Sequence, residues 1–175
     1  KTATDIGKIM ADAGVRIGGA LSDWKAYSYE FTVPSGISAT ANNYLRFVVT
    51  LGAGESIEYS ELSVTVKEEE LPPATENLIH IGDAATVPKG TTYAATATGF
   101  SFTNGTAAKV NGASWTHNIA WESGKTYIVS YKAKTSAGAT ALIAYPEMQV
   151  GGVQYNHSKT ATDIGKIMAD AGVRI

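Results

Sequence analysis

The sequence predicts an all-β protein, an antiparallel jelly-roll β-sandwich of about nine or ten strands with at most one short helix. Short segments that alternate apolar and polar residues recur along the chain, and clusters of Gly, Pro and Asn separate them. Hydrophobic residues make up 44% of the chain and charged residues only 17%, against an ordinary share of about 25% charged. Many short strands with turns between them favour two sheets that share one core.

One run of sequence occurs twice without a change. Lys1 to Ile17 and Lys159 to Ile175 both read KTATDIGKIMADAGVRI, at an offset of 158 residues. A repeat at a fixed offset is typical of arrays of structural units. We therefore expect the chain to be one period, plus a short overlap, of a longer repetitive protein, with 1–17 repeated as 159–175.

The first part of the chain is expected to hold the helix and three strands. The i, i+3, i+4 spacing of Ile6, Ile9 and Met10 predicts a short helix over 4–14, and an ordered excursion between strands is the alternative because Gly7 lies inside the run. Strands are expected at 24–33, 44–51 and 57–66, between the turns Pro34-Ser35-Gly36 and Gly52-Ala53-Gly54. Trp24 and Tyr27 are assigned to the core.

Residues 68–76 break the pattern of strands. They combine three consecutive glutamates with Pro72-Pro73. This composition is typical of a semi-rigid linker between domains, and an exposed loop is the alternative.

The second part of the chain is expected to hold the remaining strands. They are predicted at 78–81, 99–103, 106–110, 114–121, 126–134, 139–145 and 148–153. Asn104-Gly105 predicts a two-residue hairpin, and Asn111-Gly112 predicts another turn. Pro146 is expected to end a strand, and Gly151-Gly152 to mark a bend.

Several of these segments resemble jelly-roll carbohydrate-binding modules of the family 4, 9 and 22 type. The segments WKAYSYEFTVP (24–34), YLRFVVTL (44–51) and IEYSELSVTV (57–66) are similar to the closing strands of those modules. NLIHIGD (77–83) is similar to their opening strand, and ESGKTYIVSYKAKTS (122–136) to a central strand. The resemblance implies that 1–67 supplies closing strands, 68–76 a linker and 77–175 opening strands of one sandwich unit with a period of 158.

This order leaves three arrangements open. The chain closes as a circular permutant, or each chain completes the next one head-to-tail, or the sequence is an excerpt of a longer array. An array or fibre, with copies of the same chain as partners, is preferred over a closed monomer.

The resemblance also implies that sugars stack on exposed aromatic rings, with polar side chains on the hydroxyl groups. The aromatic candidates are Trp115, Trp121, Tyr145 and Tyr155, and the polar candidates are Asn118, Glu147 and Gln154. Core packing is the alternative for each ring. Related modules carry a structural Ca²⁺ held by oxygen ligands, and Asp83 and Glu61 lie at roughly matching positions.

The sequence contains no motif that indicates another class of function. Nucleophile elbows, zinc motifs and phosphate loops do not occur, and the carboxylates Glu55 and Glu58 are expected to be solvated, so no enzyme is predicted. A net charge of −2 gives no basic surface for nucleic acid, and no apolar run approaches the roughly 20 residues of a membrane span.

The sequence therefore predicts a non-catalytic, carbohydrate-binding domain of a repetitive extracellular surface protein. The alternative is a structural repeat, the subunit of a surface fibre, sheath or stalk that assembles head-to-tail without binding sugar.

Overall fold

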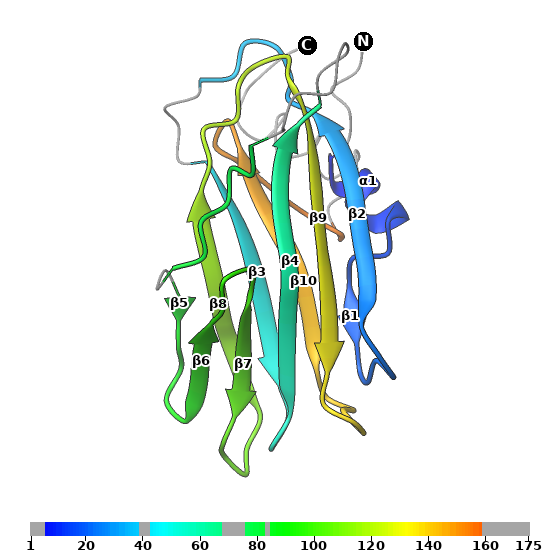
Figure 1. Cartoon of the computed structure of the whole chain (residues 1–175), viewed down its shortest axis with the longest axis vertical. Coiled ribbons are helices and arrows are strands. Elements are labelled where there is room, and N and C mark those ends of the chain that lie inside the picture. Colours follow the sequence, from blue (N-terminus) through cyan, green and yellow to red (C-terminus); the bar gives the residue numbers. More distant parts are fainter. Residues whose placement is uncertain (1–5, 39–42, 68–75, 83–84, 159–175) are drawn as a thin grey trace.

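The computed structural model describes residues 6–38, 43–67, 76–82 and 85–158, which form an all-β sandwich (Figure 1). Two antiparallel sheets contain eleven strands, and α1 (Ile6–Asp12) is the one helix in these residues. The predicted fold class and the predicted short helix are therefore confirmed. The eleven strands include β1 (Ile17–Gly18) and β5 (Ala85–Thr86), which are only two residues long each, and β6 (Thr91–Ala95), which was not expected, whereas the strand expected at 106–110 does not form. No helix in the described ranges is long and apolar enough to span a membrane.

Each sheet combines strands from both sides of the segment 68–76. The six-stranded sheet has the order β1-β10-β3-β8-β5, and β11 also pairs with β10. Its longer strands are β3 (Tyr44–Leu51), β8 (Val110–Asn118), β10 (Ile143–Val150) and β11 (Val153–Asn156). The five-stranded sheet has the order β2-β9-β4-β7-β6. Its strands are β2 (Lys25–Thr32), β4 (Ser56–Val66), β6 (Thr91–Ala95), β7 (Phe100–Asn104) and β9 (Thr126–Thr135).

Aromatic side chains fill the space between the sheets. The ring of Phe47 on β3 lies 4.7 Å from that of Tyr59 on β4 and 4.9 Å from that of Tyr131 on β9, measured between centroids. All three residues are almost fully buried. Strict alternation produces this layer, because every second residue of a strand faces the same side of its sheet. The expected core position of Tyr27 is confirmed, whereas Trp24 is 37% exposed and its assignment to the core is wrong.

The predicted hairpin at Asn104-Gly105 is wrong. Strands β7 and β8, which flank it, lie in different sheets. The side chain of Asn104 is fully buried at this crossing, and its amide nitrogen donates hydrogen bonds to the carbonyl oxygens of Leu51, Gly52 and Ala108 at 3.3, 2.9 and 2.7 Å. Asn104 therefore secures a corner between the sheets.

One further turn prediction and one strand prediction also fail. Asn111-Gly112 lies within β8, where the register against β3 shifts and Gly112 has a φ of 80°. The segment 78–81, predicted as a strand, is not a strand of either sheet, although the backbone nitrogen of Leu78 donates to the carbonyl oxygen of Val64 at 2.8 Å.

Strand β10 also departs from the expectation, because it continues through Pro146. Pro146 is buried and pairs with Phe47 of β3 along one edge of β10. Along the other edge, β10 pairs with β1 before Pro146 and with β11 after it. Gly151-Gly152 then forms a two-residue hairpin into β11, with φ values of 60° and 81°. Positive φ at both residues is the requirement of a type I′ turn, which glycine meets without strain.

Replacing Asn104 with alanine is expected to lower the free energy of unfolding by about 2 kcal/mol, because the buried carbonyl groups of Leu51 and Gly52 and the carbonyl group of Ala108 lose their donor. Urea denaturation measures the change. The exposed Asn111 is the matched control, and its alanine variant is expected to unfold like the parent protein. Equal stability of the two variants would contradict the role of Asn104 at the corner.

Candidate functional site

The four aromatic residues predicted to bind sugar divide into core and surface. Trp115 and Trp121 are both fully buried. The Trp115 ring stacks on Phe100 at 4.9 Å, and the Trp121 indole nitrogen donates a hydrogen bond to the Gln149 carbonyl at 3.0 Å. These two rings present no face to solvent, so the prediction that they stack on sugar is corrected to a role in the core.

Tyr145 and Tyr155 lie on opposite faces of the six-stranded sheet. Tyr155 is 6% exposed and pairs with Met148, whose side chain is in the core. Tyr145 is half-buried on the outer face of β10 and contacts the ring of His157 edge-on at 4.9 Å. Tyr145 is therefore the one of the four candidates whose ring lies on the outer face of this sheet.

Polar residues cover the outer face of this sheet in two rows that run across four strands. The register places directly opposed residues side by side, from β8 through β3 and β10 to β11. The first row is Asn118, Tyr44, Gln149 and Gln154, and the second is Thr116, Arg46, Glu147 and Asn156. We call these eight residues, together with the adjacent Tyr145, the polar face. It brings together the predicted Tyr145, Asn118, Gln154 and Glu147, and adds Tyr44 and Arg46, which the sequence did not single out.

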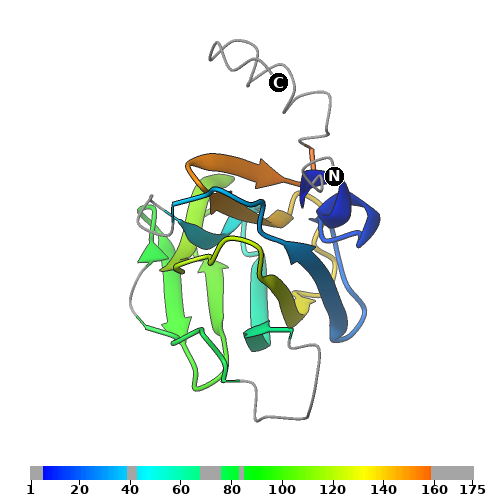
Figure 2. The ribbon, with the colours of Figure 1, turned by 90° about the horizontal axis from the view of Figure 1, so that it is seen from above.

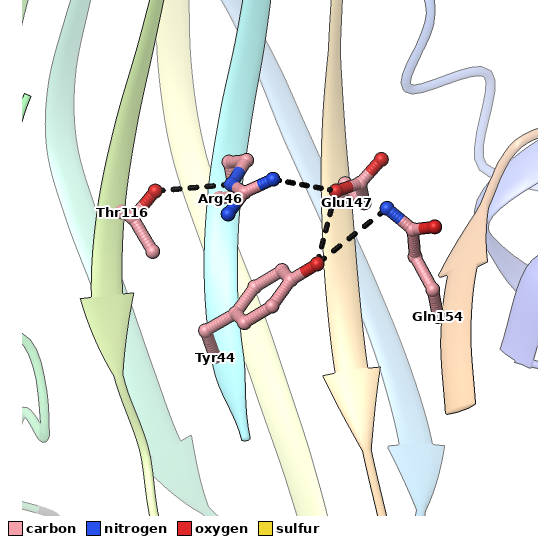
Figure 3. Close-up of polar contacts among 5 residues, drawn as sticks. All are labelled: Tyr44, Arg46, Thr116, Glu147 and Gln154. Atoms are coloured by element: carbon pink, nitrogen blue, oxygen red, sulfur yellow. Dashed lines mark hydrogen bonds and ion pairs between the residues drawn. The ribbon is translucent and has the colours of Figure 1, made fainter. Parts of the chain in front are cut away.

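A hydrogen-bonded network joins the two rows at the carboxylate of Glu147 (Figure 3). One carboxylate oxygen accepts hydrogen bonds from the Tyr44 hydroxyl at 3.2 Å and from an Arg46 guanidinium nitrogen at 3.3 Å. The other oxygen of Glu147 points away from these two partners in Figure 3. The Arg46 Nε atom donates to the Thr116 hydroxyl at 3.1 Å, and the Gln154 amide donates to the Tyr44 hydroxyl at 3.5 Å. The network holds donors and acceptors in fixed positions on the outer face of this sheet.

The electrostatics of the polar face keep its phenols neutral. Burial and the neighbouring Glu147 carboxylate both raise the pKa of Tyr44, and the same two causes raise the pKa of Tyr145. The Arg46 guanidinium lies 4.5 Å from the centre of the Tyr44 ring, a cation–π distance. The surface thus offers neutral hydroxyl groups, an amide and an ion pair, which are groups that bind hydroxyl-rich ligands.

A second surface lies on the five-stranded sheet. A hollow of about 380 Å³ is lined there by Trp24, Ser56, Glu58, Ser101, Thr103 and Lys134, among others. The half-exposed Trp24 indole is the aromatic element of this surface. Its exposure was not foreseen, because the adjoining strand pattern suggested a core residue.

The structure places only one of the two calcium candidates. Glu61 is at a bulge of β4 with a φ of 52°, and its carboxylate accepts an ion-paired hydrogen bond from Lys132 at 2.6 Å. Asp83 lies outside the described residues. Within those residues, no three His, Asp or Glu side chains gather closely enough to hold a metal ion. The calcium site therefore remains a prediction.

Glu55 differs from the solvated carboxylate that the sequence suggested. Its side chain is buried, and it accepts hydrogen bonds from the backbone N–H groups of Gly52, Thr140 and Ala141 at 2.7, 2.7 and 3.0 Å. Burial acts to raise the pKa of Glu55, but the three N–H donors outweigh it and hold the pKa below its ordinary value. Glu55 therefore fixes two loops as a charged anchor, and the exposed Glu58 matches the expectation.

No protein-family model matches the chain, and comparisons with curated proteins and with solved structures likewise give no match. The molecule is therefore classed by its own geometry, as an all-β sandwich with a polar face on one sheet and a tryptophan-lined hollow on the other.

Proposed function

We propose that this protein is a non-catalytic carbohydrate-binding domain of a repetitive extracellular surface protein, and that the polar face is its glycan-binding surface. The observation that carries the proposal is the convergence of an aromatic ring, an ion pair and amide groups on one face of one sheet. Sugars bind such surfaces because their C–H faces pack on aromatic rings while polar side chains bond their hydroxyl groups.

The network around Glu147 supports this function because it holds the ligand-binding side chains in fixed positions before a ligand arrives. Arg46, Tyr44 and Gln154 are held by hydrogen bonds to one another or to Glu147, so they lose little conformational freedom when a ligand binds. Glu147 is itself only 6% exposed, so its carboxylate holds Tyr44 and Arg46 in place for a ligand, and the half-buried Tyr145 ring supplies a packing surface one row away. We assign hydrogen bonding to sugar hydroxyl groups to Arg46, Tyr44 and Gln154, and stacking on the sugar ring to Tyr145.

Replacing Tyr145 with alanine is expected to weaken polysaccharide binding about tenfold, which corresponds to about 1.4 kcal/mol of lost stacking. Affinity gel electrophoresis over a panel of soluble polysaccharides, with and without Ca²⁺, measures the effect. Glu147→Gln is expected to weaken binding as well, because it removes the charged acceptor while keeping the shape of the side chain.

Trp24→Ala is the matched control on the opposite sheet, and it is expected to bind like the parent protein. Loss of binding in this variant alone would move the site to the hollow beside Trp24. If the parent protein is retarded by no polysaccharide under either condition, the carbohydrate-binding function is wrong.

The second candidate is a structural repeat of a surface fibre, sheath or stalk. The observation that favours it is the contact between α1, near the start of the described residues, and β11, near their end. This contact suits a chain that passes from β11 into the next copy of the repeated sequence. Light scattering that shows growth of polymers with protein concentration, together with no polysaccharide binding, would support this candidate over the first.

A further inference from the structure

Residues 6–17 of the first copy of the repeated sequence cover one open side of the sandwich, and we call the surface beneath them the groove. Helix α1 contacts β2 of the five-stranded sheet and β11 of the six-stranded sheet, and the top view shows it at the corner between them (Figure 2). The residues that face the core are almost fully buried: Ile6, Met10, Val15 and Ile17. Ile17 also pairs with Ala144 of β10 as part of β1. The segment is therefore a constituent of the core.

The second copy carries every residue that the groove contacts. Ile164, Met168, Val173 and Ile175 correspond to the four buried residues of the first copy. Gly172 corresponds to Gly14, which ends α1 with a φ of 62° and donates its N–H to Ala11 at 3.0 Å. Because the side chains and the helix-ending glycine are identical, the groove cannot distinguish the two copies by sequence.

The second copy is also tethered close to the groove. Strand β11 ends at Asn156 and contacts α1, so the described chain reaches Ser158 beside the segment that it would replace. The six residues from Lys159 to Ile164 can extend about 20 Å. A short tether gives an effective concentration in the millimolar range, which favours binding within the same chain.

We propose that residues 159–175 bind in this groove in exchange with residues 1–17 of the same chain. The protein then has one docking groove and two identical internal ligands, and the groove holds one of them at a time. This inference concerns the sandwich itself and does not depend on sugar binding.

Three variants of the full chain test the exchange. Ile6→Asp with Met10→Asp disables the first copy, Ile164→Asp with Met168→Asp disables the second, and the quadruple variant disables both. An unpaired carboxylate is strongly disfavoured at a fully buried position. Each double variant is expected to keep a cooperative thermal transition, with a midpoint within about 4 °C of the parent protein. The quadruple variant is expected to lose the transition.

The comparison between the first double variant and the quadruple variant decides the outcome. If the first double variant is as damaged as the quadruple variant, the second copy does not replace the first and the proposal is wrong. A quadruple variant that unfolds like the parent would also overturn it, because the groove would then need neither copy. Oligomers of the first double variant that grow with concentration would show docking between chains and overturn the same-chain assignment.

The three methionines allow a direct readout besides stability. Met10, Met148 and Met168 can be followed through their ¹³C-labelled methyl groups, with Met→Leu variants for assignment. When the first copy is disabled, the Met168 methyl is expected to take the chemical shift that Met10 shows in the groove. A Met168 shift that stays at its random-coil value in that variant would contradict the exchange.

Discussion

Replacing Trp115 with alanine is expected to lower the free energy of unfolding by about 3–5 kcal/mol, the range for removal of a large aromatic side chain from a core. The indole is fully buried, and its ring lies 4.9 Å from Phe100 and 6.2 Å from Phe47, so its loss leaves a cavity that these rings cannot fill. Urea denaturation at a constant m-value measures the change.

Trp24→Ala is the matched control, because its ring is 37% exposed. It is expected to change the free energy of unfolding by less than about 1 kcal/mol. Trp115→Phe provides a second comparison. The Trp115 indole nitrogen has no hydrogen-bond partner among the described residues, so phenylalanine keeps most of the packing and removes a buried donor. A Trp115→Ala variant with full stability and impaired polysaccharide binding would return this residue to the binding surface.

Replacing Glu55 with alanine is expected to lower the free energy of unfolding by about 2–4 kcal/mol at pH 7, because three backbone N–H groups lose a charged acceptor. The same bonds predict a dependence on pH. The folded state holds the pKa of Glu55 below its ordinary value of 4.5. The contribution of Glu55 to the free energy of unfolding is therefore complete at pH values above 4.5. It is lost as the pH falls through the lower pKa of the folded state. Thermal unfolding between pH 7 and pH 2 measures both effects.

The variants Glu55→Gln and Glu58→Gln distinguish the effect of the Glu55 carboxylate on stability in acid from the effects of other carboxylates. The Glu55→Gln variant keeps the shape but not the charge, so its stability is expected to fall less steeply in acid than that of the parent. Glu58 is exposed, and its variant should follow the parent curve. Parallel acid profiles for the parent and Glu55→Gln would contradict the assignment.

The strands of the first part of the chain could be predicted because their information is local. In β2 the buried Tyr27, Tyr29 and Phe31 alternate with exposed residues, which is the period of a half-buried strand. The corner at Asn104 could not be predicted in this way. Asn-Gly has the same local turn preference in a hairpin and at a crossing between sheets, and the deciding partners, Leu51 and Gly52, are more than fifty residues away. Glu55 was misjudged for the same reason, because Thr140 lies 85 residues along the chain.

The polar face was foreseen only in part. Tyr145, Asn118, Gln154 and Glu147 were singled out by residue type and by resemblance, and the structure places them on one face. Tyr44 and Arg46 occupy the outward positions of a strand that was correctly predicted. Alternation alone identifies such positions, but only the register shows that they lie opposite Glu147 and Asn118.

The buried side chain of Asn104 has a consequence for production of this protein in host cells. Asn104-Gly105-Thr106 matches the acceptor sequence for N-linked glycosylation. A glycan would be attached to the amide nitrogen that donates to Leu51, Gly52 and Ala108 inside the folded corner. Modification before folding would therefore prevent the corner from forming, and folding first would hide the acceptor. In a eukaryotic secretory pathway the yield of native protein should depend on which of the two events comes first, and a bacterial host without this modification avoids the competition.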